Sequence, residues 1–335
     1  MTLKRLRTAG VAIGLGILAS GPALAECGGA SMLPGLAQSD PAGHAAMFER
    51  AHTVPNAQGR FWKIEKPGVA PSYLLGTYHN TQAVETLPES VWEHLDTARS
   101  TWFEISLEEK ERMEADMLND PLTLLYDMSL PPLSQRIPAT ARPVLEAALA
   151  ERGVPMAAAE QMRGWMLFSL LGFPACQLQA IQSGEVVLDA ALALRAAQNG
   201  IPNHGLETYE QSLAAIEAMS STDVSAMMVD FSAALAEEED YHRTMLELYA
   251  QGEIMAIYEF GNWYSEKLGI AGAKRRAEAF LDAALTRRNH AWMEPLLPAL
   301  AEGGAFVGVG ALHLPGEDGV IELIRQAGYD VTRID

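Results

Sequence analysis

The sequence predicts an α/β (α+β) fold, in which a central mixed sheet built from N- and C-terminal strands carries a large helical insertion or cap. Strand-like segments gather near both ends of the chain, at 61–79, 100–106 and 305–334. Between them, apolar residues recur at i, i+3 and i+4, which is typical of amphipathic helices. One short strand-like segment, "IPNHGLET", interrupts this helical region after Gly200.

Residues 1–25 have the pattern of a secretory signal peptide. Three basic residues precede position 8, an apolar stretch covers 9–21, and Ala-Leu-Ala ends at position 25. A membrane anchor is the alternative, but the apolar stretch is short for a bilayer. We therefore expect cleavage before Glu26, a periplasmic or secreted protein, and no stable membrane insertion after cleavage.

Residues 26–60 are rich in Gly, Ala and Pro, and we expect a loosely structured lead-in with one short helix around "GHAAMFERA". The segment contains Cys27, and Cys176 is the second of the two cysteines in the chain. In an oxidising compartment the two can pair, although one mobile and one buried thiol is equally compatible with the sequence.

The remaining chain, 61–335, is predicted to be a single α/β domain. Two strands flank the turn residues Pro67 and Gly68, which predicts a hairpin. Ser106 followed by Glu109 forms a capping box at the start of a charged helix. The other elements follow in order: a helix over 88–98, a strand over 100–106, helical insertions at about 107–199 and 209–297, a strand over 305–313, a helix over 317–328 and a strand over 329–334.

The excess of acidic residues limits the kinds of molecule that this protein can bind. With 24 Lys and Arg against 43 Asp and Glu, the formal net charge is −19. Such a surface repels nucleic acid phosphates and anionic lipids. We expect a peptide or small-molecule substrate and no nucleic acid, and the sequence leaves the oligomeric state open.

Four strand-like segments end in a histidine or a glutamate, at His79, Glu104, Glu207 and His313. The two histidines close a repeated Gly-x-x-His pattern, in "LLGTYHN" and "VGVGALHL". Each residue alone has a structural explanation, such as a histidine bonded to a loop carbonyl or an edge-strand glutamate facing solvent. Together they form a nitrogen and oxygen set suited to a divalent metal, provided that the first and last strands are neighbours.

Several segments resemble the TraB/GumN family of bacterial proteins, which is related to the Tiki metalloproteases of animals. The segments are "YLLGTYHNT", "WFEIS", "GLETYEQ", "RRNHAWM" and "FVGVGALHLPGEDGVIELIRQAGYDVTRI", and the resemblance covers about 61–334. The wider fold group includes haem-binding ChaN-like proteins and erythromycin esterase-like hydrolases. Fold alone therefore does not define the reaction.

The resemblance implies an exported metal-dependent hydrolase, most simply a peptidase that uses a metal-activated water. It implies a divalent ion (Mn, Co or Zn) held by His79, Glu104 and His313. It also implies catalytic roles for Glu104, Glu207, Arg288 and Asn289, with Gln211 beside them. The alternative is a non-catalytic haem-, metal- or peptide-binding periplasmic protein of the same fold.

Overall fold

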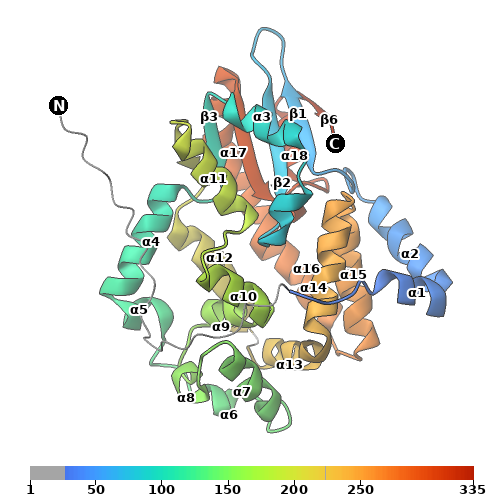
Figure 1. Ribbon diagram of the computed structural model, residues 1–335, viewed down its shortest axis with the longest axis vertical. Coiled ribbons are helices and arrows are strands. Elements are labelled where there is room, and N and C mark those ends of the chain that lie inside the picture. The colour runs from blue at the N-terminus through green and yellow to red at the C-terminus, as the bar shows by residue number, and fades with distance from the viewer. Residues whose placement is uncertain (1–26, 223) are drawn as a thin grey trace.

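A mixed sheet with the strand order β4-β3-β5-β2-β1-β6 forms the centre of the computed structural model, which describes residues 27–222 and 224–335 (Figure 1). The predicted signal peptide over 1–25 lies outside the described residues. The strands are β1 (Phe61–Glu65), β2 (Ser72–Thr77), β3 (Ser100–Phe103), β4 (Asn203–Gly205), β5 (Ala305–Gly310) and β6 (Asp330–Arg333). β1 runs antiparallel to β2 and β6, whereas β2, β5, β3 and β4 are parallel. The predicted mixed sheet and the hairpin are confirmed.

The first and last parts of the sheet are neighbours, as the paired histidines require. β2 lies beside β5, with Gly76 opposite Val309 and Thr77 opposite Gly310. Because the two strands are parallel, their carboxyl ends meet at the same edge of the sheet. His79 and His313 follow these ends by two and three residues, respectively.

The helices fall into groups separated by the strands. Before β3 lie α1 (Leu33–Ser39), α2 (Pro41–His52) and α3 (Glu89–Asp96). Between β3 and β4 lie α4 (Leu107–Asn119), α5 (Pro121–Leu125), α6 (Leu133–Arg136), α7 (Arg142–Glu151), α8 (Met156–Ala159), α9 (Gly164–Leu171), α10 (Ala175–Gln182) and α11 (Leu188–Gln198). Between β4 and β5 lie α12 (Tyr209–Thr222), α13 (Val224–Ala234), α14 (Glu238–Ala250), α15 (Ile254–Lys267), α16 (Ala273–Phe280) and α17 (Arg287–Glu302), and α18 (Val320–Gln326) precedes β6. Short 3-10 turns occupy Gln82–Thr86, Leu235–Glu237 and Ala311–His313, and a π-helical turn occupies Leu281–Thr286.

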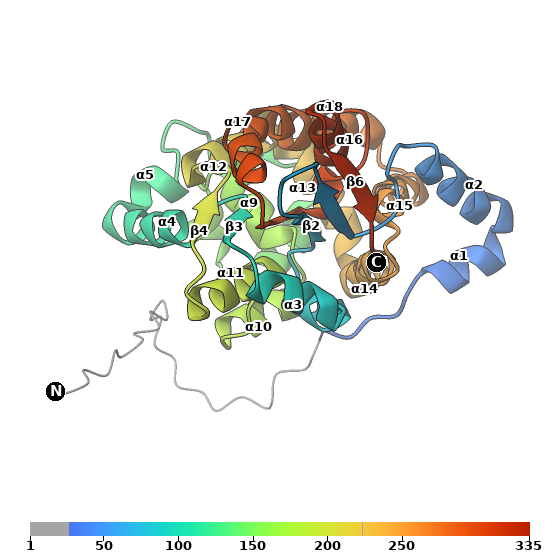
Figure 2. The same cartoon turned by 90° about the horizontal axis from the view of Figure 1, so that it is seen from above.

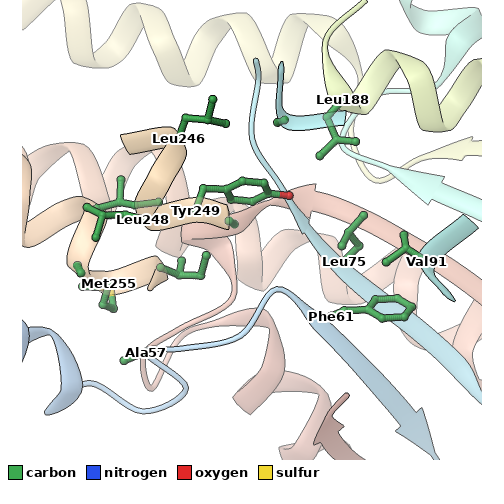
Figure 3. Close-up of a cluster of buried hydrophobic side chains, with 14 of the residues drawn as sticks. Ala57, Phe61, Leu75, Val91, Leu188, Leu246, Leu248, Tyr249 and Met255 are labelled. Carbon is green, nitrogen blue, oxygen red and sulfur yellow. The ribbon is translucent and has the colours of Figure 1, made fainter. Parts of the chain in front are cut away.

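Helices cover both faces of the sheet, as Figure 2 shows, with α17 and α18 on one side and α3, α11 and α14 on the other. Strand residues alternate between the two faces. Phe61 and Leu75 pack toward the second group, together with Leu188 and Tyr249, whose hydroxyl donates to the Gly76 carbonyl at 2.8 Å (Figure 3). Trp62, Ile64, Leu74, Val307 and Val309 pack against the buried sides of α17 and α18. The central strands are therefore buried on both faces, which fixes their register and the edge where they end.

The lead-in differs from the expectation of one short helix in a loose segment. It contains both α1 and α2, and Met47 and Ala51 are fully buried. Asp40 separates the two helices because its carboxylate accepts the Gly43 N–H at 2.9 Å and caps α2. Cys27 pairs with Cys176 in a disulfide that joins the start of this segment to α10. The Gly, Ala and Pro content indicated a loop, but tertiary burial outweighs that local signal.

Within the described ranges, no single helix has both the length and the apolar composition of a membrane crossing. The consecutive helices α9 and α10 meet both conditions only as a pair, and they are bent by 95° at the break between them.

Candidate active site

Glu104 and Glu207 lie side by side because β3 and β4 are parallel neighbours. Phe103 pairs with Gly205 at the ends of these strands, and beyond them the Glu207 N–H donates to the Glu104 carbonyl at 3.0 Å. The two carboxylates therefore leave the same edge of the sheet. This position is where open α/β sheets bind ligands.

The guanidinium of Arg288 bridges the two carboxylates. Its Nη2 lies 2.6 Å from Glu104 Oε2 and 2.5 Å from Glu207 Oε1, and its Nε donates to both Glu207 oxygens at 3.1 Å. The side chains of Arg288, Glu104 and Glu207 are only 14%, 16% and 6% exposed. Trp292 adds an indole N–H to Glu207 Oε2 at 3.1 Å. A buried ion triad of this kind is rigid, since each group depends on the others for its solvation.

The π-helical turn Leu281–Thr286 runs directly into α17, the helix that carries Arg288. A π turn contains more residues than an α turn, and such turns are frequent at functional sites. Arg288 lies in the first turn of α17, and its Nη1 donates to the Ala284 carbonyl within the π turn at 2.9 Å, which ties the side chain to that turn.

His313 is 3% exposed and neutral. Its Nδ1 lies 2.6 Å from Asn289 Oδ1, which only accepts hydrogen bonds, so the ring proton is assigned to Nδ1. The lone pair on Nε2 then faces Arg288 Nη1 at 3.3 Å and Glu104 Oε1 at 3.8 Å. Burial lowers the pKa of His313 to about 3, an effect that the Arg288 charge reinforces and the Glu104 charge opposes.

Asn289 orients His313. Its Nδ2 donates to the Asp318 carbonyl at 2.9 Å and to the His313 carbonyl at 3.3 Å, while its Oδ1 holds His313 Nδ1. Asn289 is 3% exposed, and both ends of its amide are engaged within the protein. The structure thus places Asn289 behind His313, next to Arg288 on α17.

His79 is the most exposed of the four histidine and glutamate side chains at this edge, with a side chain that is 52% exposed. Its Nδ1 lies 2.7 Å from Asp189 Oδ2, and the other Asp189 oxygen accepts the Thr77 hydroxyl at 2.5 Å. The Asp189 charge raises the pKa of His79 to about 9. Sequence reasoning missed Asp189 because an acid in the first turn of a helix is ordinary there. Its unusual feature is burial beside β2, which only the packing of α11 on the sheet reveals.

Glu104 is ionised despite its burial. Burial alone raises its pKa, but the charge of a protonated His313, the charges of Arg288 and His79, and the Gly310 N–H lower it to about 2. At neutral pH His313 is uncharged, and Arg288 and His79 are the cations near this carboxylate. The Gly310 N–H donates to Glu104 Oε1 at 2.8 Å, and a Cβ at Gly310 would lie only 3.2 Å from that oxygen.

Two cavities are lined by different members of the Arg288, Glu104 and Glu207 triad. The first, a cavity of about 230 Å³, is lined by His79, Glu104, Leu107, Lys110, Val187 and Asp189, among others. The second, a cavity of about 420 Å³, is lined by Glu207, Gln211, Arg288 and Trp292, among others. Gln211 Oε1 accepts the Thr208 N–H at 2.9 Å and so caps the start of α12. Only the first cavity is lined by both His79 and Glu104.

The donor set fits a divalent metal in its chemistry. Each histidine ties Nδ1 to a side-chain oxygen, His79 to Asp189 and His313 to Asn289, so Nε2 is the nitrogen that could bind a metal, after His79 loses its proton. Metal-binding histidines are oriented in this way by their outer partners. As the side chains stand, however, the described residues contain no group of three or more His, Cys, Asp or Glu arranged to hold a metal. Arg288 instead contacts His313 Nε2 and Glu104 Oε2, the two atoms that a bound metal ion would contact.

Comparison with known proteins identifies the family. No curated protein matches the chain. The family model described as the TraB/PrgY/gumN family matches residues 60–333, a range that begins just before β1 and ends with β6. That range contains both Gly-x-x-His segments, both strand-end glutamates and Arg288. The chain therefore belongs to the TraB/PrgY/gumN family.

Proposed function

We propose that this protein is an exported metal-dependent hydrolase that cleaves a peptide or related amide bond at the carboxyl edge of its sheet. One observation carries the proposal. His79 and His313 follow adjacent parallel strands, and each has its Nδ1 held by a side-chain oxygen, so that Nε2 is the nitrogen each ring could offer to a metal at the edge that carries the ionised Glu104, once His79 has lost its proton and Arg288 has left His313. This arrangement is the one that a metal-assisted hydrolase needs from its protein ligands.

In this proposal His79, Glu104 and His313 would hold a divalent Mn, Co or Zn ion. When bound, the ion would supply Lewis acidity to a substrate carbonyl and would lower the pKa of a bound water. Arg288 competes for the same atoms, because its guanidinium donates to His313 Nε2 and Glu104 Oε2. Loading of the site therefore requires the Arg288 side chain to turn away from His313 and toward Glu207.

The chain's own residues then have distinct roles. Arg288, held by Glu207 after this rotation, is a cation beside the reacting edge and stabilises negative charge that develops on a substrate carbonyl oxygen. Glu207 holds Arg288 and Trp292, and this makes it a positioning residue. Asn289 keeps the His313 proton on Nδ1. Glu104 Oε2 becomes a proton acceptor once Arg288 has turned away, although a carboxylate with so low a pKa is a weak base.

Two further observations support export and the kind of substrate. A disulfide between Cys27 and Cys176 suits an oxidising compartment such as the periplasm. The net charge of −19 disfavours nucleic acid as a ligand and suits a neutral peptide or small molecule.

The test measures metal content and peptide cleavage for the wild type and for His79→Ala and His313→Ala. His290→Ala is the matched control, because His290 is an exposed histidine that pairs only with Asp318 at the surface. We expect about one bound metal per chain in the wild type and in the control, with loss of metal and of cleavage in the two site variants. A wild type that binds none of Mn, Co and Zn, and cleaves no peptide with any of them added, would overturn the proposal.

The alternative is a non-catalytic ligand-binding protein. It is favoured by a cavity of about 450 Å³ among α9, α13, α14 and α15, lined by Met227, Tyr241, His242 and Met245, among others. Burial lowers the pKa of His242 to about 4, so this imidazole is neutral, as a haem ligand must be. A Soret band that appears on haem titration and is lost in His242→Ala, in a protein without hydrolase activity, would select this alternative.

A further inference from the structure

Lys110 is an unpaired cation in the cavity beside Glu104 and His79. Within the described ranges, its ammonium group has no ion pair or hydrogen bond. By contrast, Lys63 pairs with Glu65 at 2.6 Å and Lys267 with Glu237 at 2.8 Å, and Lys66 lies over the Tyr329 ring. Lys274 lies on the exposed surface of α16.

The start of α4 directs Lys110 into this cavity. Ser106 caps the helix through the Glu109 N–H at 3.1 Å, so the helix begins at Leu107, three residues after Glu104. Leu107 and Lys110 are spaced i,i+3 and therefore share one face of the helix, and both line the cavity. The neighbouring Glu109 cannot neutralise Lys110, because its carboxylate binds Arg112 at 2.6 Å and the Tyr209 N–H at 2.9 Å.

Much of the cavity lining is apolar, with Phe103, Leu107, Val187, Ala190 and Ala193. The two carboxylates that also line it are already paired, Glu104 with Arg288 and Asp189 with His79. The cavity volume of about 230 Å³ lies below the range of about 300–1,000 Å³ that is typical of pockets for drug-sized ligands. It suits one apolar side chain rather than a long segment of peptide.

We propose that this cavity binds a substrate by a free carboxylate and the apolar group next to it, with Lys110 as the carboxylate ligand. In a chain with a net charge of −19, an anion needs such a local cation to bind. The inference rests on the proposed hydrolase function and narrows its substrate class. The substrates are peptides cleaved near a free C-terminus, or N-acyl amino acids, with an apolar residue at the carboxyl end.

The experiment compares two ligands that differ only in this charge, N-acetyl-L-leucine and N-acetyl-L-leucinamide. Isothermal titration of the protein, as purified and again after a chelator, measures both dissociation constants. A charged hydrogen bond of this kind is worth roughly tenfold in affinity. We expect the acid to bind about tenfold more tightly than the amide in the wild type, and this preference to disappear in Lys110→Met.

Three further variants complete the test. Lys110→Arg retains the charge and is expected to keep the preference for the acid, and Lys274→Met, which removes an exposed lysine far from the cavity, is expected to bind like the wild type. If Lys110→Met does not fold, as judged by its circular dichroism melt, Lys110→Gln replaces it. Equal binding of acid and amide, no binding of the acid by the wild type, or a preference that survives loss of the Lys110 charge would each overturn the inference.

Binding titrations and peptide-cleavage assays together separate this inference from the proposed function. Lys110-dependent binding of the acid without cleavage of any peptide refutes hydrolysis and leaves the carboxylate site standing. Cleavage of peptides blocked at the C-terminus, at a rate unchanged in Lys110→Met, leaves hydrolysis standing and refutes the carboxylate site.

Discussion

Replacing Arg288 with methionine tests whether the triad of Arg288, Glu104 and Glu207 is as tightly coupled as its geometry indicates. The change keeps much of the side-chain volume and removes the only cation that touches both carboxylates within the described part of the chain. Glu104 and Glu207 would then keep only the neutral N–H donors of Gly310 and Trp292 beside their two negative charges, in a site that is less than one fifth exposed. We therefore expect a large loss of stability.

The magnitude follows from the pKa of Glu104, which the folded protein lowers from 4.5 to about 2. At about 1.4 kcal/mol per pH unit, this shift corresponds to roughly 3 kcal/mol of stability at pH 7. Arg288 shares the shift with other groups, but its loss also exposes Glu207 to repulsion. We expect Arg288→Met to lower the free energy of unfolding by about 3 kcal/mol.

The pH dependence has a definite sign. A carboxylate whose folded pKa lies below its unfolded pKa contributes stability above the unfolded value, and this contribution is lost as the pH falls toward the folded value. The difference between wild type and Arg288→Met should therefore be largest at pH 7 and should narrow as the pH falls from about 4.5 toward 2.

Urea unfolding followed by tryptophan fluorescence, at pH 7 and at pH 3, measures the loss of unfolding free energy and its pH dependence. Arg195→Met is the matched control, since the Arg195–Asp96 pair is also close but is 42% and 31% exposed. We expect the control to cost less than about 1 kcal/mol. A loss in Arg288→Met no larger than in the control, or one that is equal at the two pH values, would refute the reasoning.

Three further predictions concern other parts of the molecule. Replacing Cys27 and Cys176 with serine should lower stability by about 3 kcal/mol, because the bridge closes a loop of 149 residues; a reductant should destabilise the wild type in thermal melts and leave the double variant unchanged. Gly76→Ala should cost about 2 kcal/mol in urea unfolding, because the new Cβ would lie 2.7 Å from Leu314 Cδ1 and 3.0 Å from Ala311 Cα, whereas Gly35→Ala, which meets nothing within 4 Å, should cost nothing. The pKa of His242 is lowered by burial from 6.5 to about 4, so the unfolded chain takes up a proton at this residue that the folded protein does not, and this residue should cost the wild type about 2 kcal/mol of stability between pH 7 and pH 5. The stability of His242→Gln relative to the wild type should therefore rise by about that amount over this range, and a difference that does not change with pH would contradict the role given to the buried imidazole.

Much of the fold could be predicted from local patterns. The apolar runs ending at Thr77 and Gly310 indicated buried strands, and polar residues after them indicated where the strands stop. Parallel pairing then placed the residues that follow at one edge. Glu104 and Glu207 were recognised as strand-end residues, but the parallel pairing of β3 with β4 that brings them side by side was not predicted.

The partners of these residues could not be predicted in the same way. Asp189 and Trp292 lie on helices, and the way a helix is rotated on the sheet depends on packing that no local pattern records. A catalytic role was expected for Arg288. Its position between Glu104 and Glu207 follows a π turn, and the sequence "LDAALT" contains no local signal of such a turn. Lys110 was overlooked because a lysine in a charged helix is ordinarily solvated.

The pairing of β2 with β5 also has a consequence for how the protein acquires its site. The two central strands are separated by more than two hundred residues, so their pairing closes a very long loop. Until β5 has been synthesised and inserted, β2 lacks its central neighbour, and His313 and the Gly310 N–H are missing from the site. A chain whose last strands have not yet folded therefore has no assembled site, because residues from both ends of the sequence must meet to form it.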